Sequence, residues 1–320
     1  MLVLVLCVGC PNKTPKPDGK NKVEPVVTPE PAGHIEPLVP KVDDPPTETD
    51  PPTKTESPAP ETTGITSEAL GKYAAEATPL PPLEDLTAQI DEYITKIEKA
   101  LDDLDGSPKY ADDAANIVRD TTAVTLIALA IGLADVDSKY KKSASQIITA
   151  AQTLAAAKNL DEGKKGYDAL KASLTGTGSG KTLVWTDKIV HLTPAMKALP
   201  NLHAAVKRTT DTEGKLMRVL DRRAQPVYSQ LAALAVISQG CIPNVTDTPK
   251  PDAAAEWKKY CEEFRDAALK ANVAAHQYAG DKADGKEPNY AAFDASFKAM
   301  TESCDSCHKV FYPHAVGKSE

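Results

Sequence analysis

The sequence has few aromatic residues and no excess of positive charge. Aromatic residues make up 5% of the 320 positions, and 45 acidic residues outnumber 37 basic ones, for a net charge of −8. No basic stripe with interleaved aromatic side chains occurs, which argues against nucleic acid as a partner. Strand and helix patterns do not alternate along the chain, which argues against βαβ domains. The acidic residues are spread over helical segments and indicate a solvated surface.

The apolar run at residues 1–10, MLVLVLCVGC, is too short to span a bilayer. It resembles the end of a secretory signal. Gly9-Cys10 resembles the cleavage point of a bacterial lipoprotein signal, although no basic residue precedes the run and Cys7 stands in an unusual position. We therefore predict export, with Cys10 as a candidate for lipidation and a lipid anchor as the link to the membrane.

Residues 11–82 are rich in proline and poor in aromatic residues. This segment holds 17 of the 26 prolines of the chain, together with many Thr, Glu, Asp and Lys residues. Such a composition buries too little apolar surface to form a core. We predict a long disordered tether between the signal and the folded part.

The remainder of the chain is Ala-rich and shows helical periodicity throughout. Residues 83–176 contain four apolar stripes, and residues 181–320 contain a similar series, with Pro226 expected to bend one helix. Short loops between helices of this kind are typical of up-down bundles. We predict an all-α fold of two tandem four-helix bundles, preceded by the tether.

The two halves also resemble each other in sequence. Tyr140-Lys-Lys matches Trp257-Lys-Lys, and the apolar positions that follow correspond at one constant offset. A repeated spacing over a whole helix favours duplication, with chance similarity between Ala-rich helices as the alternative. The first copy has Lys181 and Val184 where the second has Cys304 and Cys307.

The most specific signal lies near the C-terminus, where residues 304–308 read Cys-Asp-Ser-Cys-His. This C-x-x-C-H pattern is typical of covalent haem attachment, in which two thiols form thioethers and the histidine binds the iron. A helix places Cys304, Cys307 and His308 on one face. The alternatives are a zinc site, for which only His314 lies close enough to help, a thioredoxin-like dithiol and a plain disulfide.

An apolar helical stripe leads into this motif. Phe293, Phe297, Met300 and Phe311 recur with the motif cysteines at spacings of three and four residues. The motif is therefore expected on the buried face of a helix. These side chains are ordinary core residues in the simplest interpretation, and Phe297, Met300 and Phe311 are candidates for packing against a haem as well.

Over about residues 181–315 the chain resembles the cytochrome c′ family. The resemblance rests on Trp257 at the start of a long Ala-rich helix and on the motif through Phe311. It implies an up-down four-helix bundle with one covalent haem c, bound through Cys304 and Cys307, with His308 as the proximal iron ligand. The family usually has a basic residue four positions after this histidine, whereas this chain has Tyr312.

The resemblance also places the distal side of the haem near residues 185–196. Met196 and His191 are the candidate ligands there, Leu192 is the apolar alternative, and His203 is a weaker candidate. A six-coordinate iron with a sulfur ligand would suit electron transfer. A five-coordinate iron would bind small gases such as NO or CO, and a peroxidase-like activity would need His191 as a polar distal group.

The other paired cysteines, Cys241 and Cys261, flank one loop. In an oxidising compartment they are candidates for a disulfide, with two buried free thiols as the alternative. The sequence as a whole predicts a periplasmic or envelope-bound mono-haem electron carrier rather than an enzyme. A gas binder, or an interaction protein that uses the haemless bundle, is the alternative, and a homodimer and the identity of the redox partner stay open.

Overall fold

The computed structural model describes residues 80–104, 110, 114–177 and 184–313. Within these ranges the chain is all-α and contains no strand, as predicted. The signal-like run, Cys10 and nearly all of the predicted tether lie outside the described residues. Lys181 and His314 also lie outside them.

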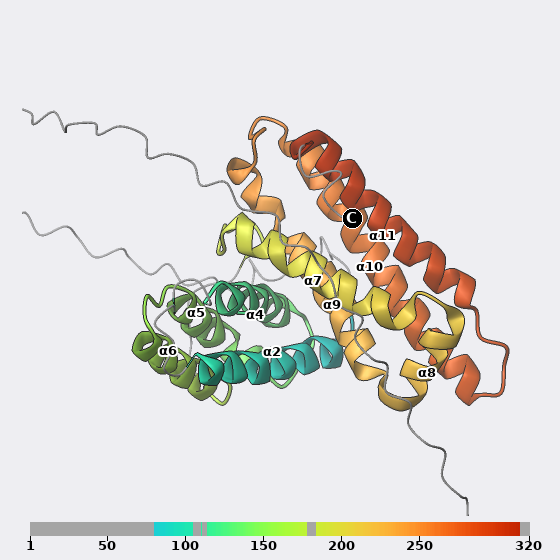
Figure 1. Cartoon of the computed structure of the whole chain (residues 1–320), viewed down its shortest axis with the longest axis horizontal. Helices are drawn as coiled ribbons and strands as arrows, with labels where there is room; N and C mark the ends of the chain where they lie inside the picture. The colour runs from blue at the N-terminus through green and yellow to red at the C-terminus, as the bar shows by residue number, and fades with distance from the viewer. Residues whose placement is uncertain (1–79, 105–109, 111–113, 178–183, 314–320) are drawn as a thin grey trace, which may run out of the picture. The chain divides into compact units, whose positions relative to one another are not determined.

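The first bundle consists of α2 (Leu83–Asp103), α4 (Ala115–Leu133), α5 (Ala144–Ala155) and α6 (Leu160–Ser173), with a short 3-10 helix, η1 (Lys141–Ser143), before α5. Consecutive helices pack against each other, and α6 returns to contact α2 (Figure 1, cyan to green). A surface ion pair between Lys171 and Glu98, 3.0 Å apart, spans this last contact. The first bundle is thus closed on all four sides.

The second bundle consists of α7 (Leu192–Thr210), α8 (Glu213–Arg223), α9 (Gln225–Gly240), α10 (Ala254–Ala283) and α11 (Tyr290–Phe311), with a 3-10 helix, η2 (Ile242–Asp247), after α9. Helix α7 packs on α9, α9 on α10, and α10 on α11, which repeats the order of contacts in the first bundle. The fourth side differs, because α7 and α11 have few close backbone contacts.

The helix predicted to bend at Pro226 is in fact two helices. Helix α8 ends at Arg223, and Pro226 lies in the first turn of α9. Proline is tolerated in a first turn because the backbone N–H that it lacks would have no partner there, whereas in a helix interior its ring clashes with the preceding turn. The chain therefore breaks where the periodicity alone predicted continuity.

Helices α4 and α9 are apolar on almost all sides because each is covered by both bundles. Helix α9 contacts α2 and α4 as well as α7 and α10, and α4 contacts α7 as well as its own neighbours. The buried residues form one continuous core, and the described residues belong to one compact unit. By length and composition α4 could cross a membrane, but most of it is buried inside the protein. The two predicted bundles thus share one core.

A glycine permits the close approach of α4 and α9. A Cβ added at Gly240 would lie 2.6 Å from Cδ2 of Leu126. We predict that Gly240→Ala lowers the free energy of unfolding by about 1–2 kcal/mol, because Leu126 has to leave its position in a packed core. Urea denaturation followed by circular dichroism measures this change.

The matched control for that variant is Gly280→Ala in α10. A Cβ at Gly280 meets no atom within 4 Å, so this substitution should leave the stability unchanged or raise it by up to about 1 kcal/mol through helix propensity. Equal effects of the two substitutions would show that the α4–α9 contact does not depend on Gly240.

One buried carboxylate ties the two bundles together. Asp85, in the first turn of α2, is fully buried and accepts hydrogen bonds from Nε2 of Gln225 and Nδ2 of Asn272, both at 3.0 Å. Nε2 of His276 lies 2.8 Å from the carboxylate, and the imidazole stacks on Tyr228 at 3.7 Å between ring centroids. The three partners of Asp85, and Tyr228 beneath the imidazole, belong to the second bundle. Among the described residues, the contact between Asp85 and His276 is the ion pair that joins the two bundles.

Candidate functional site

The Cys-x-x-Cys-His motif occupies the last turns of α11. The helix begins after Asn289, whose side chain accepts a hydrogen bond from the backbone N–H of Ala292 at 3.1 Å, and it ends at Phe311. Cys304, Cys307 and His308 therefore share one helical face, as predicted from their spacing.

Aromatic packing holds this end of α11 in place. Phe311 is 1% exposed and meets the rings of Trp257 and Tyr260 edge-on, at centroid distances of 5.2 and 6.4 Å. The indole Nε1 of Trp257 donates a hydrogen bond to the carbonyl oxygen of Cys241 at 3.0 Å. The predicted apolar stripe is confirmed, with Phe293, Met300 and Phe311 buried and Phe297 partly buried.

The two motif cysteines are partly buried thiols. Burial raises the pKa of both Cys304 and Cys307 to about 12. Reactive and redox-active cysteines usually have a lowered pKa, because the thiolate is the nucleophile. These thiols therefore lack the environment of a thioredoxin-like dithiol. His308 is partly exposed, and its ring faces Tyr312 edge-on at 6.2 Å between centroids.

Helix α7 lies opposite α11 and runs antiparallel to it. The hydroxyl of Tyr290 donates to the carbonyl oxygen of Thr210 at 3.2 Å. The ring of His203 stacks on Phe297 at 4.6 Å between centroids, and its Nε2 lies 2.9 Å from Oγ1 of Thr301. Met196 lies two turns before His203 in α7. The motif begins two turns after Phe297 in α11 and ends two turns after Thr301.

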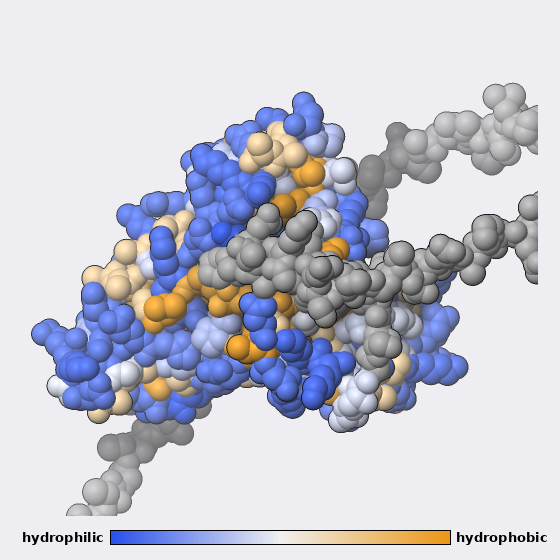
Figure 2. All heavy atoms as spheres, turned by 180° about the vertical axis from the view of Figure 1, so that it is seen from behind, coloured by the Kyte–Doolittle hydropathy of each residue, from blue (hydrophilic) through white to orange (hydrophobic). Residues whose placement is uncertain are grey.

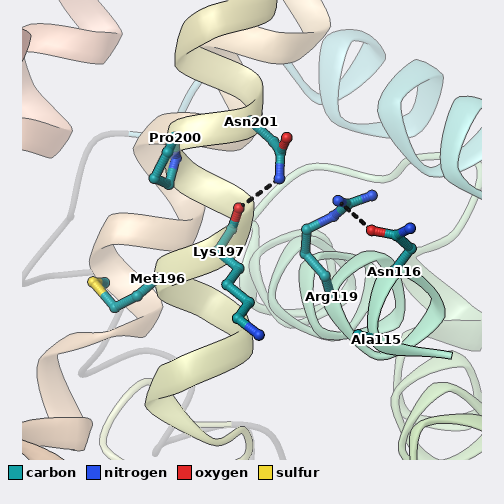
Figure 3. A pocket seen from close by; sticks show the side chains of 7 residues that line it. All are labelled: Ala115, Asn116, Arg119, Met196, Lys197, Pro200 and Asn201. Carbon is teal, nitrogen blue, oxygen red and sulfur yellow. Dashed lines mark hydrogen bonds between the residues drawn. The ribbon is translucent and has the colours of Figure 1, made fainter. Parts of the chain in front are cut away.

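By this register Met196 lies at the level of residues 304–308 and shares one side of α7 with His203, seven residues later. Met196 also lines a pocket between α4 and α7. It is partly buried against the core. Figure 3 shows its side chain extending from α7 on the side away from Asn116 and Arg119 of α4. Leu192, one turn earlier, is buried.

His191 is not placed to act as a ligand in this structure. It precedes α7 as the N-cap residue, in an extended conformation, and its side chain is exposed. His203, which the sequence ranked lower, is the histidine that contacts the motif helix. Burial, with a contribution from Lys207, lowers its pKa. The heptad spacing between Met196 and His203 is the sequence signal that could have revealed this shared face.

In the second bundle, α11 carries the motif, and its backbone makes few close contacts with that of α7. The corresponding α6–α2 side of the first bundle is closed. Helix α6 ends at Ser173, so Val184, the counterpart of Cys307, lies beyond any helix of that bundle. Side-chain contacts of His203 and Tyr290 bridge the α7–α11 side, where the backbones of the two helices make few close contacts.

The predicted disulfide between Cys241 and Cys261 is not formed in the structure, where both are buried free thiols. The backbone carbonyls of both cysteines take part in the contact of α9 with α10. Trp257 donates to the carbonyl oxygen of Cys241, and Oγ of Ser238 donates to that of Cys261 at 2.8 Å. Both cysteines therefore belong to the packed α9–α10 contact.

Burial raises the pKa of Cys241 to about 12 and that of Cys261 well above its usual value. Because only the thiolate is alkylated, we predict almost no labelling of either residue by iodoacetamide in the native protein at pH 8, with labelling increasing as the pH rises. In denaturant without reductant both should be labelled. Peptide mass spectrometry measures this, and a Cys241–Cys261 linked peptide would contradict the free-thiol structure.

The zinc alternative finds no ligand set in the part of the chain that the structure covers. There, no group of three or more His, Cys, Asp or Glu side chains is arranged to hold a metal ion. Comparison of the chain with family models, curated proteins and solved structures finds no match.

Proposed function

We propose that this chain is a c-type cytochrome that carries electrons at the cell envelope through a single covalent haem c. The observation that carries the proposal is the position of the attachment motif. Cys304, Cys307 and His308 share one face of α11, a helix whose backbone makes few close contacts with α7, whereas α6 of the sister bundle contacts α2 and carries no such motif. The resemblance to cytochromes c′ supports the same assignment.

In this proposal each residue has a defined role. Cys304 and Cys307 form the two thioether bonds, and His308 is the proximal ligand. Haem c supplies a one-electron redox couple when bound. Phe311 fixes the end of α11 against Trp257, and Met300 and Phe297 give the site apolar walls that exclude water. Met196 is the proposed distal ligand, since it lies at the level of the motif by the register of α7 against α11.

Export follows from this chemistry, because attachment of haem c belongs to an extracytoplasmic compartment. Lipidation of Cys10 and a tether over residues 11–82 would then hold the cytochrome at the membrane, and the first bundle would serve as its rigid mount. The test of electron transfer is a spectroelectrochemical titration of the purified full chain. A reversible one-electron transition supports the proposal, and the absence of any redox-active chromophore would end it.

We predict that Met196→Leu removes the distal ligand and leaves the ferrous protein able to bind CO, with a lower reduction potential, because thioether ligation favours the ferrous state. The control is Met217→Leu in α8, where the methionine side chain is exposed. Absorption spectra with and without CO and a redox titration provide the readouts. Identical spectra and potentials for Met196→Leu and the unsubstituted protein would exclude Met196 as a ligand.

A second candidate function is the binding of small gases, and buried Leu192 favours it. This apolar side chain is 3% exposed and lies near the level of the end of α11. If Leu192 rather than Met196 faces the iron, the unsubstituted ferrous protein binds CO directly. A CO-induced spectral change in that protein, unaltered by Met196→Leu, would establish the gas-binding function in place of the six-coordinate one.

A further inference from the structure

Helix α7 carries only positive charge in a protein that is acidic as a whole. Its 19 residues include Lys197, Lys207 and Arg208 and no acidic residue, whereas the net charge of the chain is −8. All three side chains are exposed, and none of them forms an ion pair with another of the residues that the structure describes. Helix α8 is mixed in charge, with exposed Arg222 and Arg223 near its end and the acidic residues Glu213 and Asp221.

The first bundle lies beside this positive surface. A pocket of about 400 Å³ lies between α4 and α7. Figure 3 shows Arg119 and Asn116 extending from α4 toward α7, and Lys197 and Asn201 on the facing side of α7. Arg119 donates to Asn116 at 2.9 Å and pairs with Asp120 at 2.7 Å. The pocket lining is Ala115, Asn116, Arg119, Met196, Lys197, Pro200 and Asn201.

The ammonium group of Lys197 and the amides of Asn116 and Asn201 are suited to a carboxylate, whereas the charge of Arg119 is offset by Asp120. Lys197, Lys207 and Arg208 of α7 are called the basic face below. Apolar docking is not favoured, because the exposed large apolar side chains in the described ranges, Val136, Met217 and Val273, are isolated in sequence. The face seen in Figure 2 carries hydrophilic side chains around its edges and apolar side chains beside the grey segment near its centre.

The basic face lies beside the proposed haem site. Lys207 is close enough to His203 to lower its pKa, and His203 contacts Phe297 and Thr301 on the motif helix. The charges of α11 itself nearly balance. Its acidic residues are Asp294, Glu302 and Asp305, its basic residues are Lys298 and Lys309, and Lys298 pairs with Glu302 at 3.9 Å.

We propose that the basic face docks an acidic surface of the partner protein that exchanges electrons with this chain. The proposal rests on the proposed electron-transfer function and adds the side of the molecule and the charge of the partner. It also gives the haemless bundle a part in docking, because Asn116, which lines the pocket with Lys197, comes from that bundle. A field of one sign next to the redox centre steers an oppositely charged partner toward productive contact.

The test compares the oxidation of the reduced, haem-loaded full chain by two small reagents, anionic hexacyanoferrate(III) and cationic tris(phenanthroline)cobalt(III). One electron passes from the protein to the reagent, giving hexacyanoferrate(II) or the cobalt(II) complex. Stopped-flow absorbance should show the rate with hexacyanoferrate(III) falling about threefold or more as ionic strength rises to about 0.2 M, because salt screens local attraction. If only the net charge of −8 mattered, the rate with hexacyanoferrate(III) would rise with ionic strength, because salt would screen the repulsion.

The decisive variant is Lys197→Gln/Lys207→Gln/Arg208→Gln, and the matched control is Lys258→Gln/Lys259→Gln/Lys270→Gln in α10, which changes the net charge equally. The first variant should lose about threefold or more of the rate with the anion at low salt, and the control should not. Equal losses in the two variants, or a rate that rises with salt, would overturn the proposal.

Two further outcomes are distinguishable from these. A chain without covalent haem would react with neither reagent, and that result would count against the proposed function rather than against the basic face. Binding to vesicles of anionic phospholipid that is lost in the α7 variant, with oxidation rates unchanged, would assign the basic face to a membrane surface and overturn the docking proposal.

Discussion

Replacing Cys304 and Cys307 with alanine should abolish covalent haem in this chain completely. The two thioether bonds are the attachment, and no other cysteine lies on the face of α11 that carries His308. Haem staining after denaturing electrophoresis measures the effect, because only covalently bound haem remains with the chain. The expected result is a stained band for the unsubstituted protein and none for the double variant.

The matched control removes the same number of thiols elsewhere. Cys241→Ala/Cys261→Ala should keep its haem, since both thiols are buried in the α9–α10 contact and neither belongs to the motif. A stained band for Cys304→Ala/Cys307→Ala would show that haem is attached at another site. Loss of the stain only in the Cys241→Ala/Cys261→Ala control would likewise contradict attachment at the motif.

His308→Ala separates attachment from ligation. The thioether bonds should still form, so the band should stain, but the absorption spectrum should change because the proximal imidazole is missing. An unchanged spectrum would place the proximal ligand on another residue, and the position of His308 on α11 would then need another explanation.

The second large effect concerns the buried pair that joins the bundles. Removing one partner of a buried ion pair commonly costs about 3–5 kcal/mol, because the remaining charge stays desolvated and unpaired. Asp85 is fully buried, whereas His276 keeps 36% of its side chain exposed. We therefore expect His276→Ala to lower the free energy of unfolding by about 2–3 kcal/mol, near the low end of that range.

The experiment is a double-mutant cycle in urea. Asp85→Asn removes the charge but keeps the shape, so His276→Ala should cost clearly less in that background. Lys139→Ala serves as the surface control, because the Lys139–Asp91 pair is 57% and 48% exposed and should contribute less than about 1 kcal/mol. An effect of His276→Ala no larger than that of Lys139→Ala, or strict additivity with Asp85→Asn, would mean that the pair does not hold the bundles together.

Helix periodicity predicted most of the secondary structure because each amphipathic helix has one buried stripe. The break at Ala224 was missed, since the apolar stripe runs on across Pro226 while the backbone cannot. The start of α7 at Leu192 was also obscured by Pro194, which fits in a first turn as well as at a helix end.

The packing between the bundles was harder to predict. The apolar run of residues 124–133 indicated a helix, but it did not say what covers that helix. The partners of Asp85 lie 140 to 191 residues away in sequence. A lone acidic residue in a first turn has an ordinary local explanation, and only the tertiary structure shows that it is fully buried.

At the candidate site the sequence correctly predicted a helix with an apolar stripe that includes Phe293, Met300 and Phe311. The motif is local, and helical geometry alone sets the positions of Cys304, Cys307 and His308. The distal side depends on how α7 registers against α11, and that register is set by long-range contacts such as the one between His203 and Thr301. The free thiols of Cys241 and Cys261 likewise belong to the contact of α9 with α10, which the loop length does not predict.

The most direct test of the central claim is the haem content of the purified full chain. A pyridine haemochrome spectrum identifies haem c by its saturated side chains, and its intensity divided by the protein concentration gives the number of haems per chain. Our account predicts one haem c per chain, because only the second bundle has the attachment motif. No haem c, or two per chain, would contradict it.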